Sequence, residues 1–172
     1  AKSDNAVVTT TGAFPTTPPG ASANNSTQSE NISVHFVDVH EEAGLNFHNV
    51  SGNSEQRFIV ESISAGIASI DYNLDGFQDL FIVDGVRVDS ASTPSGAGNR
   101  LYRNKLATVN DGAPIFSQVG AEAGVARSGW GMGCAVGDVD EDGYPDLFVT
   151  YWGPDIFYRN LGNGTFAEQG EA

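Results

Sequence analysis

Alternating hydrophobic and polar positions predict a series of short β-strands over most of the chain. The runs are rich in β-branched and aromatic residues, and they are separated by stretches rich in glycine and aspartate. The strands are expected at about residues 66–72, 79–84, 99–104 and 115–119, and again at about 132–138, 146–152, 155–160 and 165–169. The pattern therefore predicts an all-β protein with two four-stranded antiparallel units.

A further alternating run, residues 34–39, predicts one more strand before these units. A turn is expected after it at residues 41–45, where Ala43-Gly44 matches Ala123-Gly124 after the first unit. Residues 166–172 begin a third, partial copy of the same strand. We therefore expect residues 34–172 to form one repeat region.

Residues 1–33 are rich in Ser, Thr, Asn, Pro and Gly, which predicts an extended N-terminal arm. Within it, residues 6–11 are β-prone. We expect this run to dock as a strand on a neighbouring subunit; the alternatives are that the arm folds back on its own chain or tethers an absent domain. Sequons that can carry glycans begin at Asn24, Asn25, Asn31, Asn49 and Asn163.

Residues 138–146, Asp-Val-Asp-Glu-Asp-Gly-Tyr-Pro-Asp, form the motif with the clearest chemistry. Aspartates at positions 1, 3, 5 and 9 of such a loop can converge on one cation, and the glycine at position 6 permits the sharp turn. Ligands that are all oxygens favour Ca²⁺ over softer metals. The loop is not an EF-hand, because Val149 stands where that motif needs a bidentate Glu. An ordinary surface turn is the alternative interpretation.

A second copy of this loop, Asp-Tyr-Asn-Leu-Asp-Gly-Phe-Gln-Asp, occupies residues 71–79. Asp71 precedes Asp138 by 67 positions, and the flanking residues match at the same spacing. Each loop joins the first two predicted strands of its unit. Two copies of one uncommon pattern indicate a repeat protein, and four-stranded units of this length are typical of β-propeller blades.

The chain has 172 residues and a net charge of −14, from 22 acidic and 8 basic residues. This charge has the wrong sign for a nucleic-acid-binding surface. There is no apolar run long enough to be a transmembrane segment and no signal peptide; since the chain begins at Ala1, we expect that a targeting segment has been removed. Cys134 is the only cysteine and is expected to be a small buried hydrophobe.

Residues 131–149 resemble the FG-GAP, or VCBS, repeat of integrin α-chain propellers and of many secreted bacterial proteins. The finer features, Ala43-Gly44-Leu45 with Phe47-His48 and Leu-Tyr-Arg-Asn at 101–104, are similar to the cartilage acidic protein/UnbV-type group. The resemblance covers about residues 34–172. It implies an extracellular Ca²⁺-bearing propeller used for adhesion or interaction.

The resemblance also implies which residues would hold two calcium ions. The side-chain ligands would be Asp71, Asn73, Asp75 and Asp79 in the first loop and Asp138, Asp140, Asp142 and Asp146 in the second, with backbone carbonyls from Phe77 and Tyr144. Asn73 departs from the family's aspartate, so it keeps an oxygen but lowers the charge of the first loop. We therefore expect the second site to bind Ca²⁺ more tightly.

Two blades are fewer than the roughly four that the smallest propellers need. Either the chain is a piece of a longer polypeptide, or neighbouring chains supply the missing blades. Two bare blade faces are expected to carry Ile67, Phe81, Val83, Leu101, Phe148 and Phe157. Two functions remain open: a structural protein that self-associates into an oligomer or filament, and a cell-surface adhesion module that binds a glycan or protein ligand.

An enzyme is not expected, because the sequence has no Gly-x-Ser-x-Gly motif, phosphate loop or Cys/His pair. Polysaccharide lyases that use similar propellers keep this alternative open. His35, His40 and His48 lack the spacing of a helical zinc motif, although acidic neighbours of His40 leave a weak metal site conceivable.

Several aromatic and basic residues recur or cluster outside the loops. Tyr102-Arg103 and Tyr158-Arg159 occur at matching positions of both units, which indicates a structural role. We expect each Arg to pair with loop acids or strand carbonyls and each Tyr to pack between blades. Core packing is favoured over a sugar-stacking platform for Trp130, Tyr151 and Trp152.

Overall fold

The structure, a computed structural model, describes residues 36–49, 52, 59–62, 66–86, 98–105 and 115–171. The predicted arm, its β-prone run and His35 lie outside these residues. The elements found are the 3-10 helix η1 (Ile59–Ser62) and the strands β1 (Ile67–Ile70), β2 (Asp79–Ile82), β3 (Arg100–Asn104), β4 (Phe116–Gln118), β5 (Gly131–Gly137), β6 (Asp146–Tyr151), β7 (Ile156–Asn160) and β8 (Phe166–Glu171). No helix in the described part of the chain is long and apolar enough to cross a membrane.

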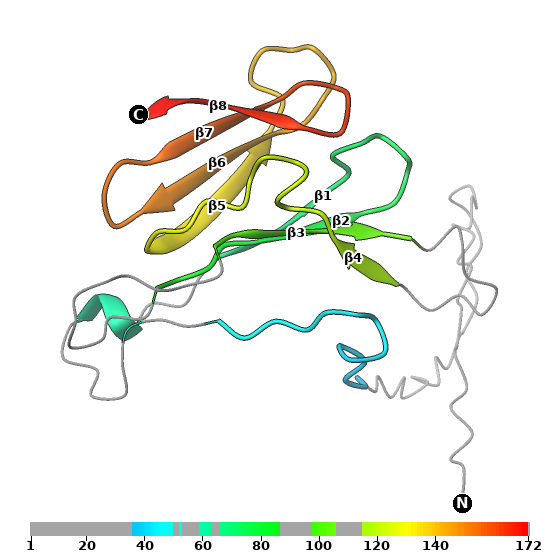
Figure 1. Ribbon diagram of the computed structural model, residues 1–172. Helices are drawn as coiled ribbons and strands as arrows, with labels where there is room; N and C mark the ends of the chain where they lie inside the picture. The colour runs from blue at the N-terminus through cyan, green and yellow to red at the C-terminus, as the bar shows by residue number, and fades with distance from the viewer. Residues whose placement is uncertain are drawn as a thin grey trace, which may run out of the picture. The chain divides into compact units, whose positions relative to one another are not determined.

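The strands form two antiparallel four-stranded sheets, β1-β2-β3-β4 and β5-β6-β7-β8, in which sequence neighbours pair (Figure 1). The strands pair at equivalent positions in the two sheets. Phe81 lies opposite Ala68 and Leu101, and Phe148 lies opposite Ala135 and Phe157. The prediction of an all-β fold with two propeller-type units is therefore confirmed, and we call the sheets the first and second blades.

The hydrophobic core lies between the two blades, where β1 runs next to β5. Alternate positions of β6 and β7 point into it, because successive side chains of a strand project to opposite faces. The first blade contributes Ile70, Tyr72, Phe81, Val83 and Leu101; the second contributes Leu147, Val149, Tyr151, Ile156, Tyr158 and Phe166. Tyr158 thus packs between the blades as expected, and Tyr102 is buried as well.

The prediction of two bare blade faces is wrong in part. Phe81, Val83 and Leu101 are fully buried, because the second blade covers their face of the first. Ile67 is exposed, as expected. Phe148 and Phe157 are half-buried and line a depression on the second blade.

The segment before the first blade also packs against it. The Gly52 N–H donates to the Val86 carbonyl at 2.9 Å. The guanidinium carbon of Arg100 lies 4.5 Å from the centre of the Phe47 ring, a cation–π distance. Residues that precede the two predicted four-stranded units therefore cover part of the first blade.

The strand predicted at residues 34–39 is wrong for the described residues 36–39, which adopt no strand. Phe36 and Val37 are exposed, and none of the strands β1–β8 pairs with this run. The turn after it is confirmed, since the Leu45 N–H donates to the His40 carbonyl at 2.8 Å. An alternating run needs a pairing partner as well as the right pattern.

The two matching Ala-Gly turns each hold the start of a blade's fourth strand. The Ala43 carbonyl accepts the Phe116 N–H of β4, and the Ala123 carbonyl accepts the Phe166 N–H of β8, both at 2.8 Å. The turn that follows the first blade therefore joins it to the second.

Candidate metal centre

The second loop links β5 to β6 and bends around the Asp138 carboxylate. Asp138 Oδ1 accepts the Asp142 N–H at 3.1 Å, and Oδ2 accepts the Gly143 N–H at 2.9 Å. Gly143 has a φ of +90°, which glycine adopts without the steric cost that a side chain would bring. This turn brings the separated aspartates of the motif to one side.

Asp138, Asp140 and Asp146 can each offer a carboxylate oxygen such that the three oxygens lie within 4.8 Å of one another. Calcium–oxygen bonds are about 2.3–2.6 Å, so two oxygens on opposite sides of one ion are about 5 Å apart. The three carboxylates therefore fit a calcium ion in size and in donor chemistry. Asp142 lies outside this group, and its Oδ1 accepts the Tyr144 N–H at 3.0 Å.

Asp146 also anchors the loop to the sheet. Its side chain is 1% exposed. Oδ1 accepts the Asn160 N–H of β7 at 2.8 Å, and Oδ2 accepts the Val139 N–H of the loop at 2.9 Å. The spacing of the aspartates predicts a ligand at this position but does not predict the anchoring role. The sequence signal for that role was the asparagine that ends both matching strands, Asn104 in β3 and Asn160 in β7.

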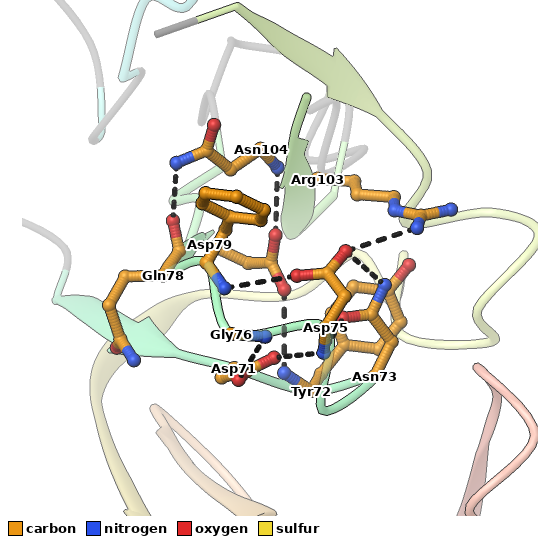
Figure 2. Close-up of polar contacts among 10 residues, drawn as sticks. Asp71, Tyr72, Asn73, Asp75, Gly76, Gln78, Asp79, Arg103 and Asn104 are labelled. Atoms are coloured by element: carbon orange, nitrogen blue, oxygen red, sulfur yellow. Dashed lines mark hydrogen bonds and ion pairs between the residues drawn. The ribbon is translucent and has the colours of Figure 1, made fainter. Parts of the chain in front are cut away.

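The first loop, between β1 and β2, has the same hydrogen-bond plan (Figure 2). Asp71 accepts the N–H groups of Asp75 and Gly76 at 3.0 and 2.9 Å. Asp79, which is fully buried, accepts the Asn104 N–H at 2.7 Å. The two loops are therefore structural repeats as well as sequence repeats.

The first loop differs at its third position, where the Asn73 amide donates to Asp75 Oδ2 at 2.9 Å (Figure 2). Residues 71–79 are all described, and their acids do not form a group of three like that of the second loop. The structure thus gathers the expected acidic ligands more closely in the second loop.

Two carboxyl groups of the first loop have opposite pKa shifts. Burial raises the pKa of Asp79 from 3.8 to about 6, against the opposing effect of hydrogen bonds from the Asn104 and Tyr72 N–H groups. For Asp75, slight burial acts to raise the pKa, but hydrogen bonds from Asn73, the Phe77 N–H and Arg103 outweigh it and lower the pKa. Asp79 is therefore the harder of the two to keep ionised without a nearby cation.

The equivalent strand pairing of the two blades also places an arginine beside each loop, as predicted from the repeated Tyr-Arg pair. Arg103 Nη2 lies 3.1 Å from Asp75 Oδ2 in the first blade. In the second blade Arg159 contacts Asp140 and Asp142. These guanidinium groups partly balance the negative charge of the loops.

The weak metal site conceivable near His40 does not form a comparable group of ligands within the described residues. His40 Nδ1 lies 2.7 Å from Asp38 Oδ1, and this hydrogen bond lowers the pKa of Asp38 and raises that of His40. Both side chains are exposed. The pair is a local surface contact.

Of the aromatic residues expected in the core, Tyr151 is buried but Trp152 is 65% exposed. Tyr151 ends β6 on its inward face, and Trp152 follows where the chain leaves the strand. The prediction of core packing is therefore wrong for Trp152. Cys134 packs against the core but is only half-buried, so the prediction of a buried hydrophobe is right in part; burial raises the pKa of its thiol.

Comparison with family models matches residues 71–149 to the FG-GAP-like repeat. The match begins at the first residue of the first loop and ends in β6, beyond the second loop. A comparison with curated proteins found no match for the chain. The matched range contains both aspartate loops and strands β2 to β5, so residues 71–149 of this chain are similar to the FG-GAP-like repeat.

Proposed function

We propose that this chain is a calcium-binding structural module that acts outside the cell, without catalytic activity, and self-associates, through the N-terminal arm expected from the sequence and through a face of the second blade. The observation that carries the calcium assignment is the group of three carboxylate oxygens of Asp138, Asp140 and Asp146. Its support is that the group lies in a loop repeated in sequence and in hydrogen bonding, within an FG-GAP-like repeat. The proposed ligands are Asp71, Asn73, Asp75, Asp79, Asp138, Asp140, Asp142 and Asp146, with the carbonyls of Phe77 and Tyr144.

Calcium would act here on the stability of the blades. Neighbouring carboxylates repel each other by roughly 1–4 kcal/mol per close pair at a high effective dielectric constant. A bound ion offsets this repulsion in the folded chain, and it favours folding because the unfolded chain has no preformed site. Since each loop joins the first two strands of a blade, ordering the loop also orders those strands.

Calcium is therefore expected to raise the melting temperature of the chain, and chelation to lower it. At a calcium concentration about 100 times the dissociation constant, one site stabilises the fold by about 2.7 kcal/mol. Differential scanning calorimetry with calcium and with EDTA measures the shift, and titration calorimetry measures the binding. Asp140→Ala should weaken binding more than Asn73→Ala, because it removes a charged ligand from the closer group.

Glu122→Ala is the matched control, because it removes one exposed acid outside both loops. It should leave calcium binding at the parental value. A melting temperature that is the same in calcium and in EDTA would contradict the proposed calcium sites.

The proposed assembly rests on the depression on the second blade, which is lined by Ala135, Val136, Gly137, Val139, Asp146, Phe148 and Phe157. Phe148, Ala135 and Phe157 occupy the register that Phe81, Ala68 and Leu101 occupy in the first blade. In the first blade this face is covered by another blade. This equivalence supports a further blade as the proposed occupant of the depression, and a second copy of this chain can supply one.

Phe148→Asp is expected to reduce self-association, because a charge on this face must lose its hydration when another blade covers it. Sedimentation velocity over a range of concentrations measures the change. Leu161→Asp, which alters an exposed apolar residue after β7, is the control and should associate like the parent. A parent chain that stays a compact monomer at high concentration would contradict the proposed association.

A further inference from the structure

Arg159 of β7 reaches two of the proposed ligands of the second calcium loop. Its Nε lies 2.5 Å from Asp140 Oδ2, and its Nη2 lies 3.3 Å from Asp142 Oδ2. The donors of a guanidinium are fixed in one plane, so a single arginine can hold two carboxylates in a defined arrangement. Arg159 thus joins the third strand of the blade to the third and fifth positions of the loop.

The first blade provides an internal comparison. Arg103 contacts Asp75, the fifth position of its loop, at 3.1 Å. The third position is Asn73, whose amide donates to Asp75. The loop with the additional aspartate is therefore also the loop in which the arginine bridges two aspartates.

The charges explain this correspondence. The second loop carries four aspartates at the proposed ligand positions and the first carries three. Without an ion, the guanidinium offsets part of the repulsion in the more highly charged loop. When an ion binds, the cationic side chain lies close to a second cation and disfavours it.

We propose that Arg159 is an internal counter-cation, which stabilises the second loop in the absence of calcium and lowers the affinity of that loop for the ion. This inference rests on the calcium sites proposed above. Arg159 then sets the calcium concentration at which the second blade becomes fully ordered. Arg103 has the same action at the first loop but a smaller one, since it bridges no second aspartate there.

The test measures calcium binding by titration calorimetry in the full chain. All variants carry Asp75→Ala, which weakens the first loop so that the titration reports the second. Arg159→Gln should tighten calcium binding roughly five- to tenfold, because a half-exposed cation, partly screened by solvent, no longer repels the ion. The same variant should melt at a lower temperature than its parent in EDTA.

Two further variants separate charge from geometry. Arg159→Lys keeps the positive charge and should bind calcium with nearly the parental affinity. Arg127→Gln removes an arginine that pairs with Glu168 at 2.6 Å, away from the loops, and should leave the affinity unchanged. Arg127→Gln changes the net charge of the whole chain by the same amount as Arg159→Gln, so it controls for that change.

The outcomes distinguish this inference from the function on which it rests. Unchanged or weaker calcium binding by Arg159→Gln, in a parent that does bind, would overturn the counter-cation role and assign Arg159 to the positioning of ligands. A parent that binds no calcium at the second loop would instead overturn the proposed function, and the counter-cation role with it.

Discussion

Replacing Asp146 with alanine is expected to destabilise the folded chain by about 2–4 kcal/mol, even when no calcium is present. The carboxylate is 1% exposed and accepts the N–H groups of Val139 and Asn160. Without it, both donors lose their acceptor; the buried Asn160 N–H alone costs about 1–3 kcal/mol when it has no partner, and the partly buried Val139 N–H adds to this. The substitution therefore damages the fold as well as the proposed ion site.

Urea unfolding in EDTA, followed by circular dichroism, measures this effect on the free energy of unfolding. Asp140→Ala is the matched variant, because Asp140 belongs to the same group of ligands but is exposed and pairs with Arg159. Its effect in EDTA should stay within about 1 kcal/mol, as for exposed ion pairs in general. Equal free energies of unfolding for the two variants in EDTA would contradict the anchoring role of Asp146.

Gly131→Ala is expected to destabilise the interface between the blades by about 2–3 kcal/mol. Gly131 begins β5, and its N–H donates to the Asp84 carbonyl of the first blade at 3.1 Å. A Cβ at this position would overlap Val83 Cγ1 and lie 2.8 Å from the Asp84 carbonyl oxygen. Val83 is fully buried and the carbonyl is backbone, so the blades must move apart to accept the methyl group.

Gly137→Ala is the control, because Gly137 ends the same strand and a Cβ there meets no atom within 4 Å. It should change the free energy of unfolding by no more than about 0.5 kcal/mol. Thermal unfolding of the two variants and the parent makes the comparison. If Gly131→Ala and Gly137→Ala have the same melting temperature, the blades do not meet as closely as the structure indicates.

The candidate site was largely predictable because its signals are local. Asp138, Asp140 and Asp146 are separated by few residues, so a single turn of the backbone brings their oxygens together. The repeat at Asp71 supports the prediction, because an accidental spacing of acids is not expected twice in one chain. Local spacing did not predict the different contacts of the individual aspartates. Asp146 is buried and accepts a hydrogen bond from β7, whereas Asp142 pairs with Arg159.

The arrangement of the blades depended on contacts that distant residues make. Phe81 and Phe148 have the same residue type and the same register, yet Phe81 is fully buried and Phe148 is half-buried. The difference arises because a second blade covers the first on that face. The alternating run at 36–39 likewise depends on distant contacts: it forms no strand, and no strand in the described part of the chain pairs with it.

The sequence by itself determined the blades, their strand order and the positions of both aspartate loops, because period-two alternation and loop spacing act over a few neighbouring residues. Only the tertiary structure decided which blade face is covered and which aspartate anchors its loop. It also placed Arg159 against two ligands and Gly131 against the neighbouring blade. These features depend on burial and close approach between segments far apart in the chain, and no local pattern of residues records that proximity.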